Sequence, residues 1–367
     1  MINDLILKVG PDYYHYEEGA IDDVTKLLRG RGAKNVLLLH GGISWEKAEP
    51  FFENVLADDQ IKFNLEKYGG ECSYAEADRV SEIVRDKKID FILGVGGGKM
   101  SDLSLLVSAK TKVPFGLVPT LASNCAPWAA LSVMYKENGL SEGKTEHQNF
   151  NSEFLVTDPN LIITSPKRYF IAGLADTIVK WYESDMVTSQ EDIIISPMVQ
   201  LSRTAAKICR EEIINNYQEA IEDLEKGQVS QVFYNLSEVI FGIAGLVGGT
   251  GGKYARNTAA HTVHDAISTY LPQVHGFLHG EKVAYGMMYQ LALEGKWDEI
   301  DNLRDFYRIL ELPKSLKDLG IDQLTDKEME EMTKYMDSKE KIHLLPIEIN
   351  QEILKETFIK LEEYINK

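Results

Sequence analysis

Short, continuous apolar runs alternate with amphipathic stretches over about the first 165 residues of the chain. Three runs, at 35–39, 90–95 and 113–118, are mostly aliphatic or aromatic, and each is followed within two residues by glycine or proline. Between them the pattern has a helical period, as at 75–87, where apolar residues recur every three or four positions. Continuous apolar strands separated by helices predict a parallel sheet covered on both faces, whose ligands bind at the carboxyl ends of the strands.

From about residue 165 onward, strand-like runs give way to long helical periodicities, for example at 197–218, 228–245 and 350–365. The second half is therefore predicted to be all helical. A chain of 367 residues is too long for one comfortable core. We predict two domains, an α/β domain at 1–163 and a helical domain at 164–367, with a site in the cleft between them.

The composition is that of a soluble globular protein, with 44% apolar and 26% charged residues. A net charge of −18 argues against nucleic acid or an anionic membrane as a partner, because both need a basic surface. Three widely spaced cysteines suit reduced thiols, and the N-terminus has no secretory signal pattern. The longest apolar run, 239–247, is about half the length of a membrane span. We expect a cytoplasmic protein that acts on a small molecule.

A glycine-rich segment, Gly94-Val95-Gly96-Gly97-Gly98-Lys99-Met100-Ser101-Asp102, follows a predicted strand and precedes a helical pattern. Glycines at such a turn let backbone amides approach phosphate oxygens, and a helix N-terminus favours the negative charge. Two familiar phosphate motifs do not fit. Leu93 stands where a P-loop needs glycine, and Lys99 stands where the GxGxxG fingerprint needs its third glycine. The segment is interpreted as a pyrophosphate cradle, and the alternative is a turn that needs glycine only for packing.

Four of the eight histidines lie close together in the second half: His261, His264, His275 and His279. Such clustering favours metal binding or proton transfer over isolated core histidines. The HExxH motif of zinc proteases is absent. A catalytic zinc usually takes three protein ligands, and Asp176 is a plausible third, although spacing alone does not distinguish it from many other acids.

Several separated motifs together resemble the iron-containing alcohol dehydrogenase superfamily, in its glycerol dehydrogenase-like branch. The resemblance covers about residues 5–300 and implies a dehydroquinate synthase-like fold, in which a dinucleotide-binding, Rossmann-like α/β domain precedes a helical domain that binds metal and substrate. It also implies a homo-oligomer. The motifs are, in order, Gly96-Gly97-Gly98-Lys99-x-x-Asp102, Pro119-Thr120-Leu121-Ala122-Ser123, Leu131-Ser132-Val133-Met134-Tyr135, Asp176, His261-x-x-His264 and His279-Gly280-Glu281-Lys282-Val283-Ala284.

The resemblance implies a role for each matching residue. Asp176, His261 and His279 would hold one divalent metal, with zinc expected rather than iron, and His264 would relay a proton near the substrate. The metal would polarise a substrate oxygen while a hydride moves to or from nicotinamide. The residues implied to line the cofactor are Gly97, Gly98, Lys99, Asp102, Thr120, Ser123, Leu131 and Tyr135.

Two departures from glycerol dehydrogenases bear on the substrate. Cys125 stands where those enzymes carry an aspartate that contacts the polyol, and Lys180 lies one helical turn after Asp176. Losing an anion and gaining a cation favours a 2-hydroxy or 2-oxo acid, with Lys180 and Cys125 at the site. The segment at 124–128 also resembles the hydroxycarboxylate dehydrogenase A subgroup, which reduces 2-oxo acids. The alternative for Lys180 is a pairing with a surface acid such as Glu183.

A third departure concerns the cofactor. Gly41 and Gly42 follow the first strand, where NAD-preferring members often carry an acid that holds the ribose 2′-hydroxyl. A carboxylate would repel a 2′-phosphate, whereas glycines with Ser44 and Lys47 nearby would accept one. We expect NADP(H) in preference to NAD(H); the alternative is a glycine turn without influence on the choice.

The sequence therefore predicts a metal-dependent, NAD(P)-linked oxidoreductase that acts on the CH–OH group of a small hydroxy acid or the corresponding oxo acid. Glycerol dehydrogenase is the first alternative. A dehydroquinate synthase-like lyase is the second, although such enzymes usually carry glutamate at the position of Asp176. A non-catalytic nucleotide-binding protein is the third, and the presence of all three implied metal ligands argues against it.

Overall fold

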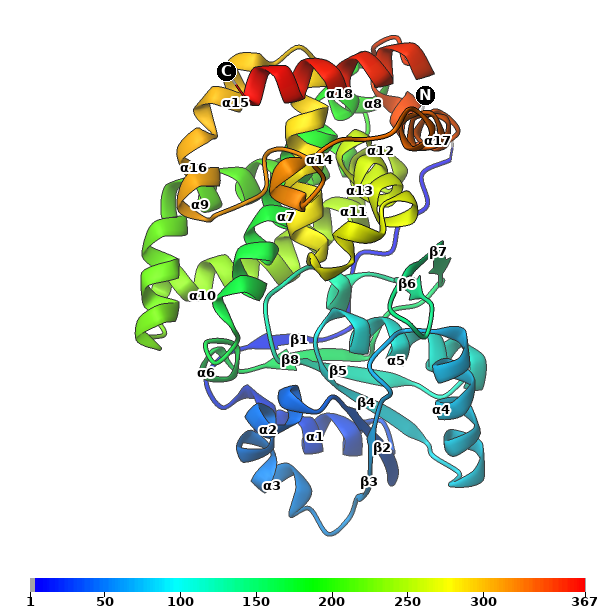
Figure 1. Ribbon diagram of the computed structural model, residues 1–367. Coiled ribbons are helices and arrows are strands. Elements are labelled where there is room, and N and C mark those ends of the chain that lie inside the picture. The colour runs from blue at the N-terminus through cyan, green and yellow to red at the C-terminus, as the bar shows by residue number, and fades with distance from the viewer. Residues whose placement is uncertain (1–3, 367) are drawn as a thin grey trace. The chain divides into compact units, whose positions relative to one another are not determined.

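The computed structural model describes residues 4–366 and divides the chain into two compact units (Figure 1). The α/β unit contains Lys8–Phe170 and Glu219–Gly245. Of the described residues, the helical unit contains 4–7, Ile171–Gln218 and 246–366. Residues 219–245, which the sequence assigned to the second domain, thus cluster with the α/β unit. As functional domains, 1–163 and 164–367 stay a prediction.

A six-stranded sheet with the order β1-β8-β5-β4-β2-β3 forms the α/β unit, and every neighbouring pair is parallel. The three predicted strands are the central ones β2, β4 and β5, so the predicted parallel sheet is confirmed. The strands are β1 (Tyr14–Tyr16), β2 (Asn35–His40), β3 (Lys62–Lys67), β4 (Phe91–Gly96), β5 (Phe115–Pro119) and β8 (Phe154–Thr157).

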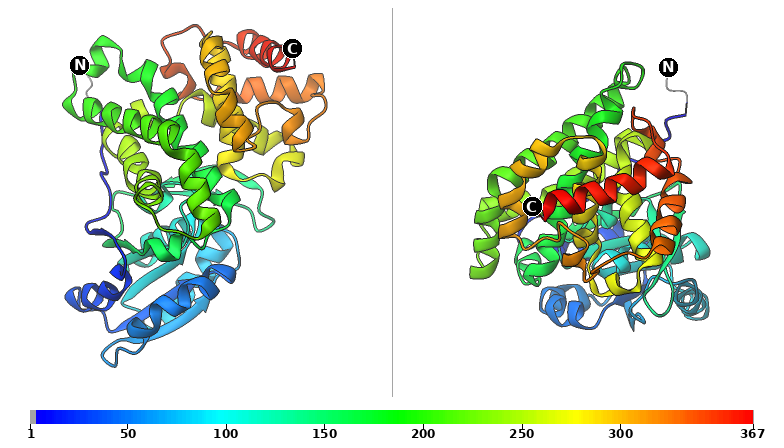
Figure 2. Two further views of the ribbon diagram at one scale, coloured as in Figure 1. Left: turned by 90° about the vertical axis from the view of Figure 1, so that its left-hand side faces the viewer. Right: turned by 45° about the horizontal axis from the view of Figure 1, so that its top comes forward.

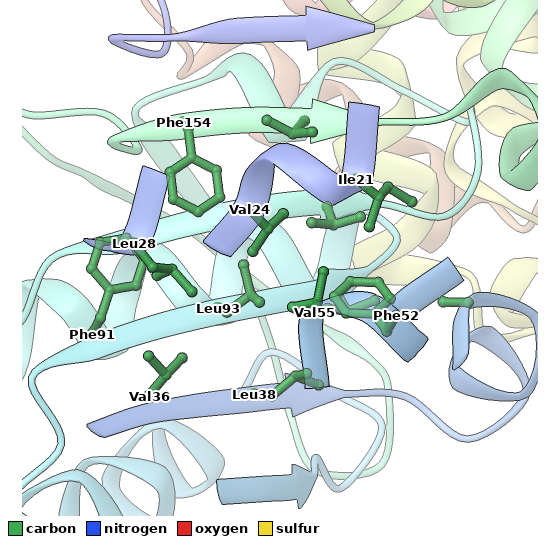
Figure 3. Packing of buried hydrophobic residues seen from close by; sticks show 14 of the residues in the cluster. Ile21, Val24, Leu28, Val36, Leu38, Phe52, Val55, Phe91, Leu93 and Phe154 are labelled. Atoms are coloured by element: carbon green, nitrogen blue, oxygen red, sulfur yellow. The ribbon is translucent and has the colours of Figure 1, made fainter. Parts of the chain in front are cut away.

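Helices pack on both faces of this sheet because alternate strand residues point to opposite sides. Val36 and Leu38 of β2 join a core with the helices on one face, and Figure 3 shows this packing around Phe91, Leu93 and Phe154. Leu37 and Leu39 join a second core with the helices on the other face. The first face carries α1 (Asp23–Gly30), α2 (Ile43–Ala48) and α3 (Glu53–Leu56), and the second carries α4 (Tyr74–Asp86) and α5 (Gly98–Thr111).

An antiparallel hairpin, β6 (Leu131–Tyr135) and β7 (Ser141–His147), follows β5 and packs through β6 on α5. Trp128, just before β6, fills the space above glycines: a Cβ at Gly10 or Gly245 would lie within 2.5 Å of its ring. Gly245 follows a turn of π-helix at Val239–Ile243.

The helical segment Gln231–Gly251 is 21 residues long, and its most apolar window has a mean hydropathy of 1.4. By length and composition this helix could cross a membrane, although the run at 239–247 is itself about half a span, because the helix also includes residues 231–238 and 248–251. Within the structure 61% of the window is buried, as in the core helix of a soluble protein.

After Thr157 the described chain, to residue 366, contains helices and no strand, as the sequence predicted. Figure 2 shows these helices from two further directions. Those longer than eight residues are α7 (Lys167–Thr188), α9 (Pro197–Lys226), α13 (Ala259–Tyr270), α14 (His279–Leu293), α17 (Asp326–Asp337) and α18 (Gln351–Ile365). The shorter ones are α6 (Pro159–Ile162), α8 (Glu191–Ile194), α10 (Gln231–Glu238), α11 (Ala244–Gly251), α12 (Lys253–Arg256), α15 (Trp297–Asn302) and α16 (Arg304–Ile309).

Helix α14 approaches two other helices of the helical unit very closely. A Cβ at Gly280 would lie 1.9 Å from the carbonyl oxygen of Ala172 in α7. A Cβ at Gly286 would lie 2.2 Å from the carbonyl oxygen of Ala260 in α13. No side chain fits at either position, and glycine therefore sets how near α14 can come to α7 and α13.

Candidate metal centre and cofactor loop

Three helices of the helical unit bring together the residues implied as metal ligands. Asp176 lies on α7, His261 on α13, and His279 is the first residue of α14. The Nε2 atoms of His261 and His279 each lie 3.3 Å from Oδ1 of Asp176. One ligand atom from each residue falls within 4.8 Å of the other two. The structure thus assembles one carboxylate oxygen and two imidazole nitrogens around one point.

The chemistry of this group fits a divalent metal. Oδ1 of Asp176 is buried and makes no hydrogen bond of acceptable geometry to the described residues, although both imidazoles converge on it. A buried carboxylate oxygen without a bonded partner is costly, and a cation would satisfy it. Oxygen and imidazole donors suit zinc and iron, and three protein ligands leave a position open for substrate. As metal ligands the three residues stay a prediction.

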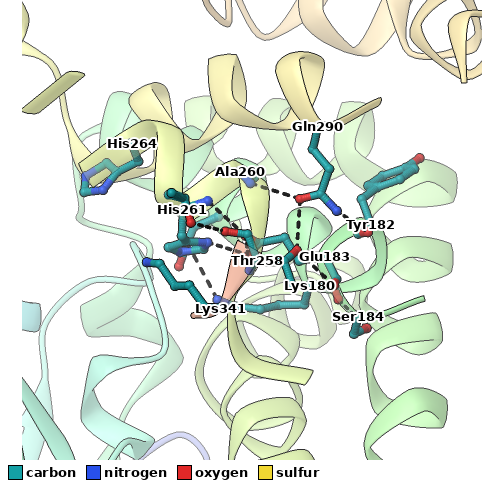
Figure 4. A network of polar contacts seen from close by, with 12 residues as sticks. Lys180, Tyr182, Glu183, Ser184, Thr258, Ala260, His261, His264, Gln290 and Lys341 are labelled. Atoms are coloured by element: carbon teal, nitrogen blue, oxygen red, sulfur yellow. Dashed lines mark hydrogen bonds and ion pairs between the residues drawn. The ribbon is translucent and has the colours of Figure 1, made fainter. Parts of the chain in front are cut away.

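Glu183 orients His261 from behind. Its Oε2 accepts a hydrogen bond from Nδ1 of His261 at 2.5 Å, and its Oε1 accepts the backbone N–H groups of Thr258 and His261 (Figure 4). With the proton on Nδ1, the lone pair of His261 is on Nε2 and faces Asp176. Burial alone would lower the pKa of His261, but the carboxylates of Glu183 and Asp176 raise it. The description of Glu183 as a surface acid is therefore wrong, because its side chain is fully buried.

Lys180 lies on the same face of α7 as Asp176, one turn later. Its Nζ is 3.9 Å from Oδ1 of Asp176, and the residue is only 6% exposed. Burial would raise the pKa of Asp176, but Lys180 and the two imidazoles hold it well below its usual value. The ammonium is thus placed beside the candidate metal ligands and away from bulk water.

His264 contacts His279 rather than the other ligands. Its Nε2 lies 3.1 Å from Nδ1 of His279, and its Nδ1 lies 3.0 Å from Oδ1 of Asp265. Lys341 donates a 2.6 Å hydrogen bond to the other oxygen of Asp265. Burial is the main cause that holds the pKa of His264 well below its usual value, and the neighbouring His279 is the next. The imidazole of His264 is therefore neutral.

The glycine-rich segment forms the turn from β4 into α5, as predicted. None of its glycines has a positive φ, so their requirement comes from close approach. A Cβ at Gly96 would lie 2.8 Å from Cβ of Met100, and a Cβ at Gly98 would lie 2.8 Å from the amide of Asn124. Packing therefore demands glycine at position 96, whereas at position 98 the Asn124 side chain would have to move. The same turn leaves backbone N–H groups of Gly97 and Gly98 at the start of a 14-residue helix.

Two polar side chains of α5 are already engaged within the α/β unit. Lys99 donates a 2.7 Å hydrogen bond to Glu71 and lies 4.9 Å from the centre of the Tyr135 ring. Asp102 is buried, accepts a hydrogen bond from the backbone N–H of Val133 at 3.1 Å, and leaves Oδ1 unbonded within the described chain. Burial raises the pKa of Asp102 to about 8. Asp102 thus ties β6 to α5.

The other implied cofactor residues follow β5. Thr120 is buried, its Oγ1 has no hydrogen-bond partner among residues 4–366, and its backbone N–H donates to Gly96. Ser123 and Leu131 are partly exposed. Cys125 is a partly exposed thiol outside any disulfide, and it begins the turn containing Trp128. As catalytic or cofactor residues all four stay predictions.

Gly41 and Gly42 follow β2, which pairs with β4 so that His40 lies opposite Val95. A Cβ at Gly41 would lie 2.4 Å from Oγ of Ser44, and a Cβ at Gly42 would lie 3.3 Å from Nζ of Lys67. Lys67, at the end of β3, therefore stands over this turn. From the sequence we expected Lys47 at this turn, but Lys47 is exposed on α2. Lys67 was not predicted, because only strand pairing brings the end of β3 to Gly42.

Comparisons with known proteins agree with the geometry. A sequence model of the iron-containing alcohol dehydrogenase family matches residues 11–159. Hydroxycarboxylate dehydrogenase A of Escherichia coli (strain K12) is 30% identical over 364 residues, which is 99% of each protein. The chain belongs to the iron-containing alcohol dehydrogenase family. The resemblance predicted from the sequence is confirmed.

Other relatives of this chain carry related names. Glycerol dehydrogenase of Thermotoga maritima is 30% identical over 342 residues, 88% of this chain and 90% of that protein. The crystal structure of glycerol dehydrogenase from Schizosaccharomyces pombe matches with a TM-score of 0.86 at 26% identity, over 100% of this chain and 92% of that one. These relatives are named as dehydrogenases and not as lyases. The structural match confirms the predicted fold class. The protein is a dehydrogenase of this family, whose members are NAD(P)-linked and metal-dependent.

Proposed function

We propose that the protein interconverts a small 2-hydroxy acid and the corresponding 2-oxo acid, with zinc and NADP(H). The observation that carries the proposal is the buried ammonium of Lys180, 3.9 Å from Oδ1 of Asp176. A divalent ion held by Asp176, His261 and His279 would polarise the oxygen of a substrate C–O group. An anionic group on the neighbouring carbon would then come near Lys180.

The charge around the candidate site supports an anionic substrate. A cation buried beside a carboxylate is stabilised by it, and a substrate carboxylate would add a further partner in a place with little water to screen the charges. Cys125 also supports the proposal, because a thiol is a weak hydrogen-bond acceptor for the hydroxyls of a polyol. Hydroxycarboxylate dehydrogenase A of Escherichia coli, 30% identical over nearly the whole chain, has a name of the same substrate class.

The test is a panel of carbonyl substrates with the zinc- and iron-loaded enzyme, with NADPH and NADH, and with Lys180→Met beside the parent. We expect the KM for 2-oxo acids to rise in Lys180→Met by about 10- to 100-fold, the worth of a hydrogen bond to a charged group. Uncharged ketones and aldehydes of the same size should keep their kcat/KM. Lys167→Met, which removes an exposed lysine of the same helix that pairs with Glu225, is the matched control.

Two results would contradict the proposal. One is the oxidation of glycerol by the parent with no turnover of any 2-oxo acid, which would support glycerol dehydrogenase, the second candidate favoured by the relatives of that name. The other is an equal loss of activity toward charged and uncharged carbonyls in Lys180→Met, which would assign Lys180 to the metal site alone.

The preference for NADP(H) is supported by the turn after β2. Gly41 and Gly42 add no carboxylate, and Lys67, whose ammonium makes no ion pair within residues 4–366, stands over Gly42. The glycine cradle follows β4, the neighbour of β2, and an adenosine ribose reaches the end of the adjacent strand in folds of this type. Lys67 would then face the 2′-phosphate.

Lys67→Met should raise the KM for NADPH by about tenfold or more and leave the KM for NADH unchanged, because only NADPH carries the extra phosphate. Steady-state kinetics at varied cofactor concentration measures both values. Lys47→Met, on the exposed side of α2, is the control and should change neither. A parent enzyme that uses NADH better than NADPH, or a Lys67→Met variant with the parent's cofactor preference, would contradict the assignment.

A further inference from the structure

Asp265 and Lys341 lie outside the candidate ligand set but are linked to it by an unbroken series of short contacts. Lys341 precedes a short 3-10 turn at Ile342–Leu344, and Asp265 lies on α13. Nζ of Lys341 lies 2.6 Å from Oδ2 of Asp265, and Oδ1 of Asp265 lies 3.0 Å from Nδ1 of His264. Nε2 of His264 lies 3.1 Å from Nδ1 of His279. The series ends where Nε2 of His279 faces Asp176 at 3.3 Å.

Each contact in the series fixes the position of one proton. A carboxylate can only accept, so Nδ1 of His264 carries the hydrogen that is donated to Asp265. A neutral imidazole with its hydrogen on Nδ1 has its lone pair on Nε2, and this lone pair can accept only from an N–H of His279. His279 therefore carries its hydrogen on Nδ1 and presents the lone pair of Nε2 toward Asp176.

We propose that Asp265, held in place by Lys341, is a positioning residue that sets the tautomer of the metal ligand His279 through the intervening ring of His264. The inference rests on the proposed metal centre. Under this proposal, a carboxylate sets the tautomer of each of the two candidate histidine ligands. Glu183 fixes His261 by direct contact at 2.5 Å, whereas Asp265 fixes His279 across a second imidazole.

The two carboxylates that orient the histidines, Glu183 and Asp265, differ in their exposure to solvent. The side chain of Glu183 is fully buried, whereas those of Asp265 and Lys341 are 35% and 28% exposed. A carboxylate at this depth is partly hydrated, so its hold on His264 depends on the Lys341 ammonium, which fixes the side chain in one orientation. A change at Lys341 is therefore expected to act on the metal in the same direction as a change at Asp265, but less strongly.

The test measures zinc affinity in the absence of substrate and cofactor, by competition with a chromogenic chelator. Asp265→Ala should raise the zinc dissociation constant by about 10- to 100-fold, as the loss of groups that orient metal ligands usually does. Lys341→Met should raise it by a smaller factor. The control is Asp337→Ala, because Asp337 is a similarly exposed carboxylate 3.5 Å from another histidine, His343, that has no contact with the ligand set.

A second measurement reads the tautomer itself. The zinc-loaded parent, labelled with ¹⁵N in its histidines, is expected to show His264 protonated on Nδ1, with the resonance assigned by its loss in His264→Gln. Protonation of His264 on Nε2 would overturn the proposal, even if Asp265→Ala failed to fold. A folded Asp265→Ala variant with the zinc affinity of the parent would overturn it as well. A parent that binds no zinc would instead refute the proposed metal centre.

Discussion

Buried carboxylates in the two units have opposite electrostatic surroundings. Asp176 and Glu183 are surrounded by cationic or hydrogen-bonding side chains, which outweigh burial and hold the pKa of each below its usual value. Asp102 accepts one backbone N–H, faces no cation in contact, and has its pKa raised to about 8 by burial. Near neutral pH the first two are therefore ionised, whereas Asp102 is largely a neutral acid.

The raised pKa of Asp102 predicts a pH dependence of stability. The folded state binds a proton at Asp102 between about pH 4 and pH 8 that the unfolded state does not, so this residue makes the free energy of unfolding fall as pH rises through that range. Asp102→Asn, which keeps an acceptor for Val133, should flatten that fall and raise stability at pH 8. Urea denaturation at pH 5 and pH 8 measures it, and an unchanged slope would contradict the assignment.

At the residue scale, the sequence indicated the candidate ligands but not their supports. The histidines were visible as a cluster, and Asp176 became recognisable through a family motif. Glu183 carried a usable signal, since Asp176, Lys180 and Glu183 lie four and three positions apart on one face of the same helix. Asp265 and Lys341 had none, because 76 positions of chain separate the two members of this pair.

At the element scale, the position of α14 depends on two glycines. Gly280 contacts the carbonyl of Ala172 on α7, and Gly286 contacts the carbonyl of Ala260 on α13. Because His279 is the residue before Gly280, the same close approach that packs the helices brings its imidazole to Asp176. The packing of α14 and the position of the candidate ligand His279 therefore depend on the same close contact.

Gly280→Ala is expected to lower both stability and metal affinity. Its Cβ would lie 1.9 Å from a backbone oxygen, so α14 must move, at a cost of about 1–3 kcal/mol or more, and His279 moves with it. Thermal unfolding and zinc titration measure the two effects. Gly276→Ala is the matched control, because a Cβ there meets nothing within 4 Å. Full zinc affinity in Gly280→Ala would contradict the coupling.

The strands show what an apolar pattern can and cannot predict. The central strands β2, β4 and β5 are covered on both faces and appear as continuous apolar runs. The edge strand β3, with the sequence Lys-Phe-Asn-Leu-Glu-Lys, is mostly polar, as suits a strand with one unpaired side. The three-residue edge strand β1 is too short for any periodicity. The position of Lys67 beside Gly42 depends on β3, which explains why it could not be predicted.

At the scale of the whole molecule, the metal and the cofactor are expected to bind to different units. The candidate metal residues all lie in the helical unit, and the glycine cradle lies in the α/β unit. A ligand that binds the folded state stabilises the unit that contains its site. Metal and cofactor should therefore have separable effects on unfolding.

Zinc at 100 times its dissociation constant should stabilise the fold by about 2.7 kcal/mol and raise the melting temperature of the metal-free protein. His279→Ala should abolish the rise caused by zinc and keep the rise caused by NADPH. Differential scanning calorimetry with each ligand alone and with both measures the effects. A zinc-dependent rise that persists in His279→Ala would place the metal elsewhere.

The contact of Gly280 with α7 also bears on how such an enzyme can acquire new substrates. At position 280, beside His279, no side chain larger than hydrogen can be accepted, so substitution there offers no route to a new substrate. On α7, position 180 already carries a long side chain next to the same ligands, so shorter side chains fit there without a backbone clash. Changes of specificity by single substitutions are therefore expected at position 180 on α7, while position 280 stays glycine among descendants of this chain.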